Sequence, residues 1–360
     1  MTEKNLFNRA KEKETYNADS IEVLEGLEPV RKRPGMYIGG TDERAMHHLV
    51  SEVLDNSMDE AVAGYASKID VHIHEDFSVS VTDNGRGIPV DPHPKHPNKS
   101  ALEVILSTLH AGGKFSGEAY QTSGGLHGVG ISVVNALSAK LKVEVVRDHK
   151  IFRQSFSRGV TVSSLQSGET VKRKSGTKVT FSPDPQIFGE NKHFKPSKLL
   201  KMVRSKAYLF SGVELNWYCS EQCLTQNETT PQKAKFHFPG GLADYLEESL
   251  QSYQMYSPLP FSGKIIFAEK FKNHTIGSVE WAINWTPQRD GFISSYCNTI
   301  PTSEGGTHEL GFCTALLKGI KSFADLVGHK KGSQLTKEDI MSGGCALISV
   351  FIREPEFVGQ

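Results

Sequence analysis

The most regular pattern of apolar and polar positions in the chain runs from Met46 to Tyr65. At 100° per residue the apolar side chains of this stretch fall on one broad arc, as in a helix that packs one face on a core. These are Met46, Val50, Val53, Leu54, Met58 and Ala61. The polar side chains gather on another arc, within roughly 100° of one another. They are His48, Glu52, Asp55, Asn56 and Asp59.

The polar face of this predicted helix has the chemistry of an acid–base and metal site. Three carboxylates at helical spacing repel one another by roughly a few tenths of a kcal/mol per pair, unless a cation or a proton relay relieves them. Glu52 suits a general base that takes a proton from water, with His48 one turn earlier to orient it or share the proton. Asn56 offers a neutral oxygen to a hard cation such as Mg²⁺. The alternative is an ordinary solvated acidic face, and the helix alone does not separate the two.

Elsewhere the pattern predicts further helices and strands in alternation. Helices are expected at 20–33, 100–113, 131–138, 195–210, 240–250 and 307–327. A hairpin is expected within 67–90 with its turn at Glu75 and Asp76, and a strand-rich stretch at 141–181 that ends in the alternating SGTKVTFSP. Further strands are expected between the helix at 195–210 and residue 220, and at 263–271, 278–285 and 346–352. A polar stretch at 220–235 separates two such groups of elements. With 360 residues and 38% hydrophobic content, two domains are expected.

Charge and cysteine usage narrow the class of protein. The 41 basic and 41 acidic residues cancel, so bulk charge does not indicate a nucleic-acid partner. No apolar run approaches the length of a membrane span, and the first residues lack the apolar stretch of a signal peptide, so a soluble cytoplasmic location is expected. Five scattered cysteines argue against a disulfide framework, and Cys219 and Cys223 lack the further ligands of a zinc site.

Two glycine-containing loops carry further candidate chemistry. In DNGRGIP, residues 83–89, a carboxylate ends an apolar strand, where it would be half-buried and would need a donor such as the amine of adenine. Gly85 and Gly87 would let the backbone approach a flat ligand, although DNGRG is also an ordinary turn sequence. In GGLHGVG, residues 124–130, glycines precede an apolar helix, which is typical of a phosphate cradle. Its spacing fits neither a dinucleotide fingerprint nor a P-loop.

Together these segments supply a base, a metal ligand, an adenine reader and a phosphate loop, in that order, within about 80 residues. They resemble the nucleotide-site motifs of the GHKL ATPases, a family that includes gyrase, the ninety-kilodalton chaperone, histidine kinases and mismatch-repair ATPases. The matching segments are 52–60, 83–89, 124–130 and Gly176 with Thr177. The flanking sequence resembles the ATPase region of bacterial type II topoisomerase B subunits over nearly the whole chain. It is closer to the topoisomerase IV branch, with the gyrase branch as the alternative.

The resemblance implies an α+β fold in two domains. The first is an α/β sandwich in which helices cover one face of a mixed sheet, and the second is a smaller α/β transducer domain. The implied division is an N-terminal dimerisation arm at 1–20, the ATP-binding domain at 21–230 and the transducer at 231–360.

The resemblance also implies roles for individual residues. Glu52 is the expected catalytic base, His48 supports it, Asn56 holds Mg²⁺, and Asp83 with Thr177 reads adenine. Further ATP contacts are implied for Arg86, Gly87, Pro89, Lys114, Tyr120, Gly125, Leu126, His127, Gly128, Val129, Gly130 and Ile131. Tyr16 on the arm would reach the nucleotide of a partner copy. Gln360 would begin a Gln-x-Lys loop whose lysine lies beyond the sequence.

The implied activity is hydrolysis of MgATP to drive dimerisation of an N-terminal gate and passage of DNA strands. DNA, the topoisomerase A protein, a second copy of the chain and competitive ATP-site inhibitors are the expected partners. Two alternatives stay open. A GHKL histidine kinase would need phospho-acceptor helices upstream, where only about 20 polar residues precede the first predicted helix. A nucleotide-binding module with little hydrolysis would be expected if the missing lysine is essential.

Overall fold

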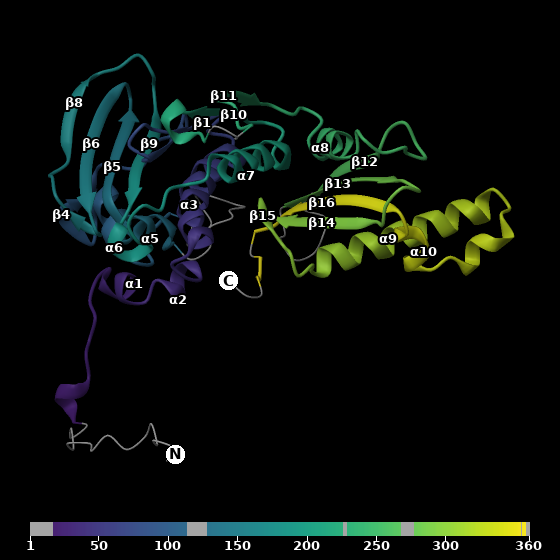
Figure 1. The fold of residues 1–360 in the computed structure, drawn as a ribbon, viewed down its shortest axis with the longest axis horizontal. Helices are drawn as coiled ribbons and strands as arrows, with labels where there is room; N and C mark the ends of the chain where they lie inside the picture. The colour runs from purple at the N-terminus through teal and green to yellow at the C-terminus, as the bar shows by residue number, and fades with distance from the viewer. Residues whose placement is uncertain (1–16, 114–127, 226–228, 268–276, 354, 358–360) are drawn as a thin grey trace, which may run out of the picture.

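The computed structural model describes residues 17–113, 128–225, 229–267, 277–353 and 355–357 (Figure 1). The helices are α1 Glu28–Lys32, α2 Gly35–Ile38, α3 Glu43–Val62, α4 Ala101–Ser107, α5 Gly130–Ala136, α6 Pro185–Phe188, α7 Pro196–Leu209, α8 Leu242–Ser249, α9 Thr307–Leu326 and α10 Lys337–Met341. Short 3₁₀ turns are η1 Ala18–Ser20, η2 Glu221–Cys223 and η3 Lys330–Gln334. None of the described helices is both long enough and apolar enough to cross a membrane.

The strands of the described residues form two main sheets and a short hairpin. The first sheet contains β1 Lys68–Ile73, β2 Val79–Asp83, β5 Ser138–Arg147, β6 Lys150–Ser157, β7 Val160–Thr161, β8 Gln166–Thr170, β9 Gly176–Pro183, β10 Glu214–Cys219 and β11 Lys233–Phe236. The second contains β12 Phe261–Phe267, β13 Gly277–Trp285, β14 Phe292–Cys297, β15 Ile300–Pro301 and β16 Gly344–Phe351. The hairpin pairs β3 Pro92–His93 with β4 His96–Ser100.

The first sheet is mixed, with the order β11-β10-β1-β2-β9-β5-β6-β7 and β8 also paired with β6. β1 and β10 run parallel, whereas the other neighbouring strands run antiparallel. Helices α3, α5 and α7 contact this sheet and form one helical layer beside it (Figure 1). The predicted α+β fold, with helices on one face of a mixed sheet, is confirmed.

Helix α3 forms as the periodicity predicts. Asp42 caps its N-terminus, because the Asp42 carboxylate accepts a hydrogen bond of 2.9 Å from the backbone N–H of Ala45. The apolar arc is buried against the sheet, where Leu49 and Leu54 have no exposed surface. Burial of each such side chain contributes about 1.5–3 kcal/mol. This helix is therefore held rigidly in the first core, and its polar side chains have fixed positions.

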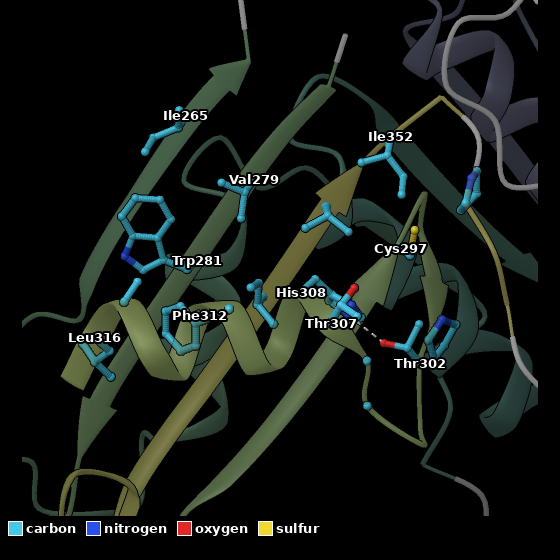
Figure 2. Close-up of a pocket in the computed structure, with 18 of the residues that line it drawn as sticks. Ile265, Val279, Trp281, Cys297, Thr302, Thr307, His308, Phe312, Leu316 and Ile352 are labelled. Carbon is cyan, nitrogen blue, oxygen red and sulfur yellow. Dashed lines mark hydrogen bonds between the residues drawn. The ribbon is translucent and has the colours of Figure 1, made fainter. Parts of the chain in front are cut away.

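The second sheet has the order β12-β13-β16-β14-β15 and is covered on both faces. Along β16, Cys345 and Leu347 pack with α8, whereas Ala346 packs with α9 and α10, as the alternation of a strand requires. Cover by α9 is incomplete, and a cavity of about 1760 Å³ remains between the helix and the sheet. Figure 2 shows Trp281, Phe312 and Leu316 lining it.

Several sequence predictions need correction. The helix expected at 20–33 is wrong for most of its length, because the chain bends at Gly26, where φ is +58°, and α1 begins only at Glu28 with Pro29 in its first turn. The helix expected at 100–113 ends at Ser107. The hairpin is confirmed, with β1 antiparallel to β2 and the turn at 74–78. β14 was not predicted.

The division of the chain at residues 20 and 230 stays a prediction. Strand β11 pairs with β10, so the first sheet continues past residue 230 to Phe236. Residues 1–16 of the proposed arm lie outside the described residues.

Asp184 stabilises the first domain through a buried ionic cluster. Arg31 Nη2 and Arg158 Nε donate to its carboxylate at 2.7 and 2.9 Å. Burial favours the neutral carboxyl, but the two guanidiniums outweigh it and hold the pKa of Asp184 below its ordinary value. The stability that this gives is present above the unfolded-state pKa near 4 and is lost as the pH falls.

We therefore expect Asp184→Ala to lower the free energy of unfolding at pH 7 by about 2 kcal/mol, because two partly buried arginines lose their counter-charge. Urea unfolding measures the change. Glu22→Ala is the control, since Glu22 pairs with Lys32 on the surface and should cost under about 1 kcal/mol. Equal effects of the two variants would contradict this assignment.

Candidate active site

Glu52 lies where α3 meets the start of α5. His48 Nε2 is 3.3 Å from Glu52 Oε1, one helical turn away. The other carboxylate oxygen lies so close to Gly130 that a Cβ added at Gly130 would overlap Glu52 Oε2. The structure thus brings together a carboxylate, an imidazole and the last glycine of the GGLHGVG segment, although 78 positions separate Glu52 from Gly130 in the sequence.

The polar face of α3 divides in two, which the periodicity did not predict. Asp55 turns toward α7, where its Oδ1 lies 2.6 Å from Lys206 Nζ. Asp59 is buried, with only 3% of its surface exposed. The repulsion expected among the three carboxylates is therefore relieved for Asp55 by a lysine of the chain, and Glu52 is the one that lies beside His48.

Asp83, at the end of β2, is a buried hydrogen-bond acceptor. It accepts from the backbone N–H of Gly85 at 2.9 Å, from Ser57 Oγ at 3.1 Å and from the backbone N–H of Thr177 at 3.3 Å. Burial raises the pKa of Asp83 to about 6, although these donors partly oppose the shift and the Glu60 carboxylate adds to it. The carboxyl group is therefore ionised at neutral pH and neutral in mild acid.

The GT pair at the start of β9 is fitted around Asp83. Gly176 has a φ of +138°, and a Cβ there would overlap the carbonyl oxygen of Asp83. Thr177 is also buried, and its Oγ1 accepts a hydrogen bond of 3.3 Å from the backbone N–H of Ile88. The DNGRGIP segment and the GT pair thus meet at Asp83, as segment 52–60 and the end of the GGLHGVG segment meet at Glu52.

Both domains match families of known proteins. A family model described as histidine kinase-, DNA gyrase B-, and HSP90-like ATPase matches residues 41–187, and a model described as DNA gyrase B matches residues 241–360. The 43K ATPase domain of Thermus thermophilus gyrase B, solved with an aminocoumarin, has 39% sequence identity and a TM-score of 0.76, over 92% of this chain and 83% of that one. This chain belongs to the ATPase regions of the type II topoisomerase B subunits.

Other members of this family agree with the assignment. The topoisomerase IV ATP-binding domain of Francisella tularensis, solved with a small-molecule inhibitor, has 34% identity and a TM-score of 0.72, over 94% of this chain and 85% of that one. The DNA topoisomerase 4 B protein of Bartonella bacilliformis is 56% identical over 97% of this chain, and the DNA gyrase B protein of Thermotoga maritima is 44% identical over 96%. The chain spans about half the length of these curated relatives, 50% and 53% respectively.

The remaining candidate residues fall into those that the structure describes and those that lie outside the described residues. Arg86 pairs through Nη2 with Glu60 Oε1 at 2.7 Å, and its guanidinium lies 3.7 Å from the ring centre of Tyr65. Gly87 has a φ of +79° and accepts from Arg147 Nη1 at 2.8 Å, while Pro89 is exposed. Gly128, Val129 and Ile131 are half-buried around the start of α5. Tyr16, Lys114, Tyr120, Gly125, Leu126, His127 and Gln360 lie outside the described residues.

The sequence did not predict the residues that contact the candidate site residues Asp83, Arg86 and Gly87. Ser57 and Glu60 lie within the matching segment 52–60, so their spacing relative to Asp83 and Arg86 is a signal that was not used. Tyr65 and Arg147 carried no comparable signal, because no motif spacing links them to their partners, Arg86 and Gly87.

Asn56 fits a metal that arrives with a phosphate ligand. It is half-buried on α3, one turn after Glu52. Among the described residues no group of three or more His, Cys, Asp or Glu side chains could hold a metal ion by itself. Mg²⁺ commonly takes one or two protein oxygens and completes its shell with phosphate oxygens and water. A single amide oxygen at this position is compatible with that mode of binding.

Gly130→Ala tests the close approach of Glu52 to α5. The added methyl group would displace the Glu52 carboxylate. Displacement of a catalytic group by about 1 Å can lower the rate by about 10²-fold. We expect kcat for ATP hydrolysis to fall to that extent. Gly319→Ala is the control, because a Cβ there would meet nothing within 4 Å. Unchanged turnover in Gly130→Ala would show that the contact is not needed.

The shifted pKa of Asp83 predicts a pH dependence of nucleotide affinity. The ionised carboxylate is acceptor-only, whereas the neutral carboxyl group carries an O–H donor on one oxygen, and the pKa of Asp83 is about 6. Affinity for ADP should therefore rise from pH 5 to about pH 7 and then level off, by calorimetric titration. Asp83→Asn is the matched control, since it keeps the titration of the phosphates themselves. The same pH profile in both proteins would contradict this role.

Proposed function

We propose that this chain binds MgATP and hydrolyses it with Glu52 as the general base. The observation that carries the proposal is the position of Glu52, in contact with the start of α5 and 3.3 Å from His48. A carboxylate there takes a proton from the attacking water, and the imidazole orients the carboxylate or shares that proton. A positioned base of this kind contributes about 10²- to 10⁴-fold in rate.

Asp83 recognises adenine in this proposal. Its buried carboxylate already accepts from Ser57, Gly85 and Thr177, which fixes its orientation for one further donor. The six-amino group of adenine supplies that donor, whereas guanine presents an oxygen at the same place. Two acceptors facing each other in a buried site are unfavourable, so GTP should bind weakly. The hydroxyl of Thr177 lies beside Asp83 as a second polar group of the pocket.

Mg²⁺ would be held by Asn56 together with the phosphates, and it would neutralise charge on the leaving phosphate. The glycine segment that ends at Gly130 would wrap the phosphates with backbone N–H groups. Lys114 and the Gln-x-Lys loop begun by Gln360 would add further phosphate contacts. Tyr16 would reach the nucleotide of a partner copy and order the N-terminal arm, so that ATP binding drives dimerisation.

For the whole protein we propose the topoisomerase IV activity, ATP-driven strand passage that relaxes and decatenates DNA together with the topoisomerase A protein. The identity of 56% to a topoisomerase 4 relative, against 44% to a gyrase relative, supports this branch over negative supercoiling by a gyrase. The inhibitor complexes of two relatives support the proposal that the Asp83 pocket admits competitive ligands.

Glu52→Gln tests the proposed base. The amide keeps the size of the side chain but cannot take a proton, so kcat should fall by about 10²- to 10⁴-fold while affinity for a non-hydrolysable ATP analogue stays nearly constant. Phosphate release, measured in a form of the protein that extends past Gln360, gives the rate. Glu43→Gln is the control on the same helix, where Glu43 pairs with Lys195 and Lys198 on the surface.

Two outcomes would argue against this mechanism. Wild-type turnover in Glu52→Gln would remove Glu52 from the reaction. Binding of the analogue without hydrolysis in the extended wild-type protein would favour the alternative of a nucleotide-binding module.

A further inference from the structure

Lys206, on α7, is a buried lysine whose ammonium group joins the two domains. Only 4% of the residue is exposed. Its Nζ lies 2.6 Å from Asp55 Oδ1 on α3, the helix that also carries Glu52 and Asn56. It also donates to the backbone oxygen of Thr299 at 2.7 Å and lies 3.3 Å from Thr299 Oγ1. Thr299 belongs to the turn between β14 and β15, which lies beside α3 and α7 (Figure 1).

The ammonium group donates hydrogen bonds to two oxygens of Thr299 and forms an ion pair with Asp55. An ammonium has three N–H donors and no acceptor, and burying it is costly unless it is paired and fully hydrogen-bonded. Both hydrogen-bond acceptors belong to Thr299 of the second domain, whereas the negative charge that pairs with the ammonium group is the Asp55 carboxylate of the first. A relative displacement of α3 and the β14–β15 turn by about 1 Å would take at least one of these contacts out of hydrogen-bonding range.

The Asp55 end of this contact belongs to the proposed nucleotide site. Asp55 directly precedes Asn56 and follows Glu52 by three positions on α3. Its second oxygen accepts a hydrogen bond of 3.2 Å from Ser51 Oγ. The carboxylate is therefore fixed to the same helical turn that carries the proposed base and metal ligand, and it moves with that turn.

The Thr299 end is fixed to the end of β16. Asn298 and Thr299 both have positive φ, +48° and +69°, and each is only 2% exposed. Such strained backbone persists only where surrounding contacts hold it. Here Asn298 exchanges two hydrogen bonds of 2.9 Å with the backbone of Ile352. Ile352 directly follows β16, and it lies with Cys297 at one end of the second-domain cavity (Figure 2).

Other contacts hold α7 to the second domain without Lys206. Tyr208 stacks on Phe238 and on Tyr245, with ring centres 3.6 and 4.3 Å apart, and Arg204 pairs with Glu248 of α8. Loss of the Lys206 contacts should therefore leave the domains associated. That loss would remove only the link between the helical turn of α3 that contains Asp55 and the β14–β15 turn of the second sheet.

We propose that Lys206 is a positioning residue that couples nucleotide occupancy at α3 to the β14–β15 turn and the end of β16. This inference rests on the proposed ATP site. When the nucleotide shifts the Glu52–Asn56 turn, Asp55 moves with it, and the ammonium group changes how it is shared between Asp55 and Thr299. The turn, and with it the start of the segment that leads to Gln360, responds to that change.

The test compares the wild type with Lys206→Met/Asp55→Asn, a double variant that removes both charges and so leaves neither buried alone. Lys198→Met is the matched control, because Lys198 also joins α7 to α3, through Glu43, but at an exposed position. Hydrogen exchange of peptides covering 292–302 and 344–353 is measured with and without a non-hydrolysable ATP analogue and Mg²⁺. Calorimetric titration measures binding of the analogue.

In the wild type and Lys198→Met we expect the analogue to change exchange in both peptides by about fivefold or more, which is the lower end of common coupling between sites. In the double variant the analogue should still bind, and this difference should disappear. A purely structural role would instead raise exchange equally with and without the analogue. The inference is overturned by a difference that persists in the double variant, by its equal loss in Lys198→Met, or by its absence in a wild type that binds. A wild type that does not bind the analogue overturns the proposed function, and this inference with it.

Discussion

The arrangement of the proposed nucleotide site depends on the burial of one carboxylate, Asp83. A buried carboxylate without donors would be strongly unfavourable, so the chain must bring hydrogen-bond donors to the end of β2. It does so from three places: Ser57 on α3, Gly85 in the following turn and Thr177 at the start of β9. Satisfying this one group therefore fixes the helix that carries Glu52 against the central strands, and the raised pKa of Asp83 reflects the remaining cost of burial.

The glycines of the motifs have a common steric cause. At Gly85 a Cβ would lie 2.7 Å from Glu60 Oε2, at Gly130 it would overlap Glu52, and at Gly176 it would overlap the backbone of Asp83. Each of these three glycines thus makes room for an acidic residue of another motif. Glycine is often explained by backbone freedom, but at Gly85 and Gly130 the space taken by a carboxylate is sufficient reason. Motifs that are far apart in the sequence are therefore complementary surfaces in the fold rather than independent loops.

Local patterns were enough to predict the parts of the fold whose cause is local. The apolar arc of α3 and the alternation of β1 and β2 follow from burial of one face, so periodicity finds them. The helix expected at 20–33 failed because Gly26 and Pro29 outweigh its apolar spacing. The motifs and the resemblance identified Glu52 and Asp83 as candidates. The Asp55–Lys206 pair could not be found this way, because periodicity places Asp55 on a face but does not say which distant helix meets it.

The contacts of α7 with the second domain are of two physical kinds, and they constrain motion differently. The stack of Tyr208 with Phe238 and Tyr245 is broad and apolar, so small sliding movements change its energy little. The contacts of Lys206 are a short hydrogen bond to Thr299 and a close ion pair with Asp55, both buried, so their energy depends steeply on position. A joint built from both kinds keeps the domains together while it remains sensitive to small shifts of one turn of α3. Such a combination suits an enzyme in which nucleotide binding to one domain changes the conformation of the other.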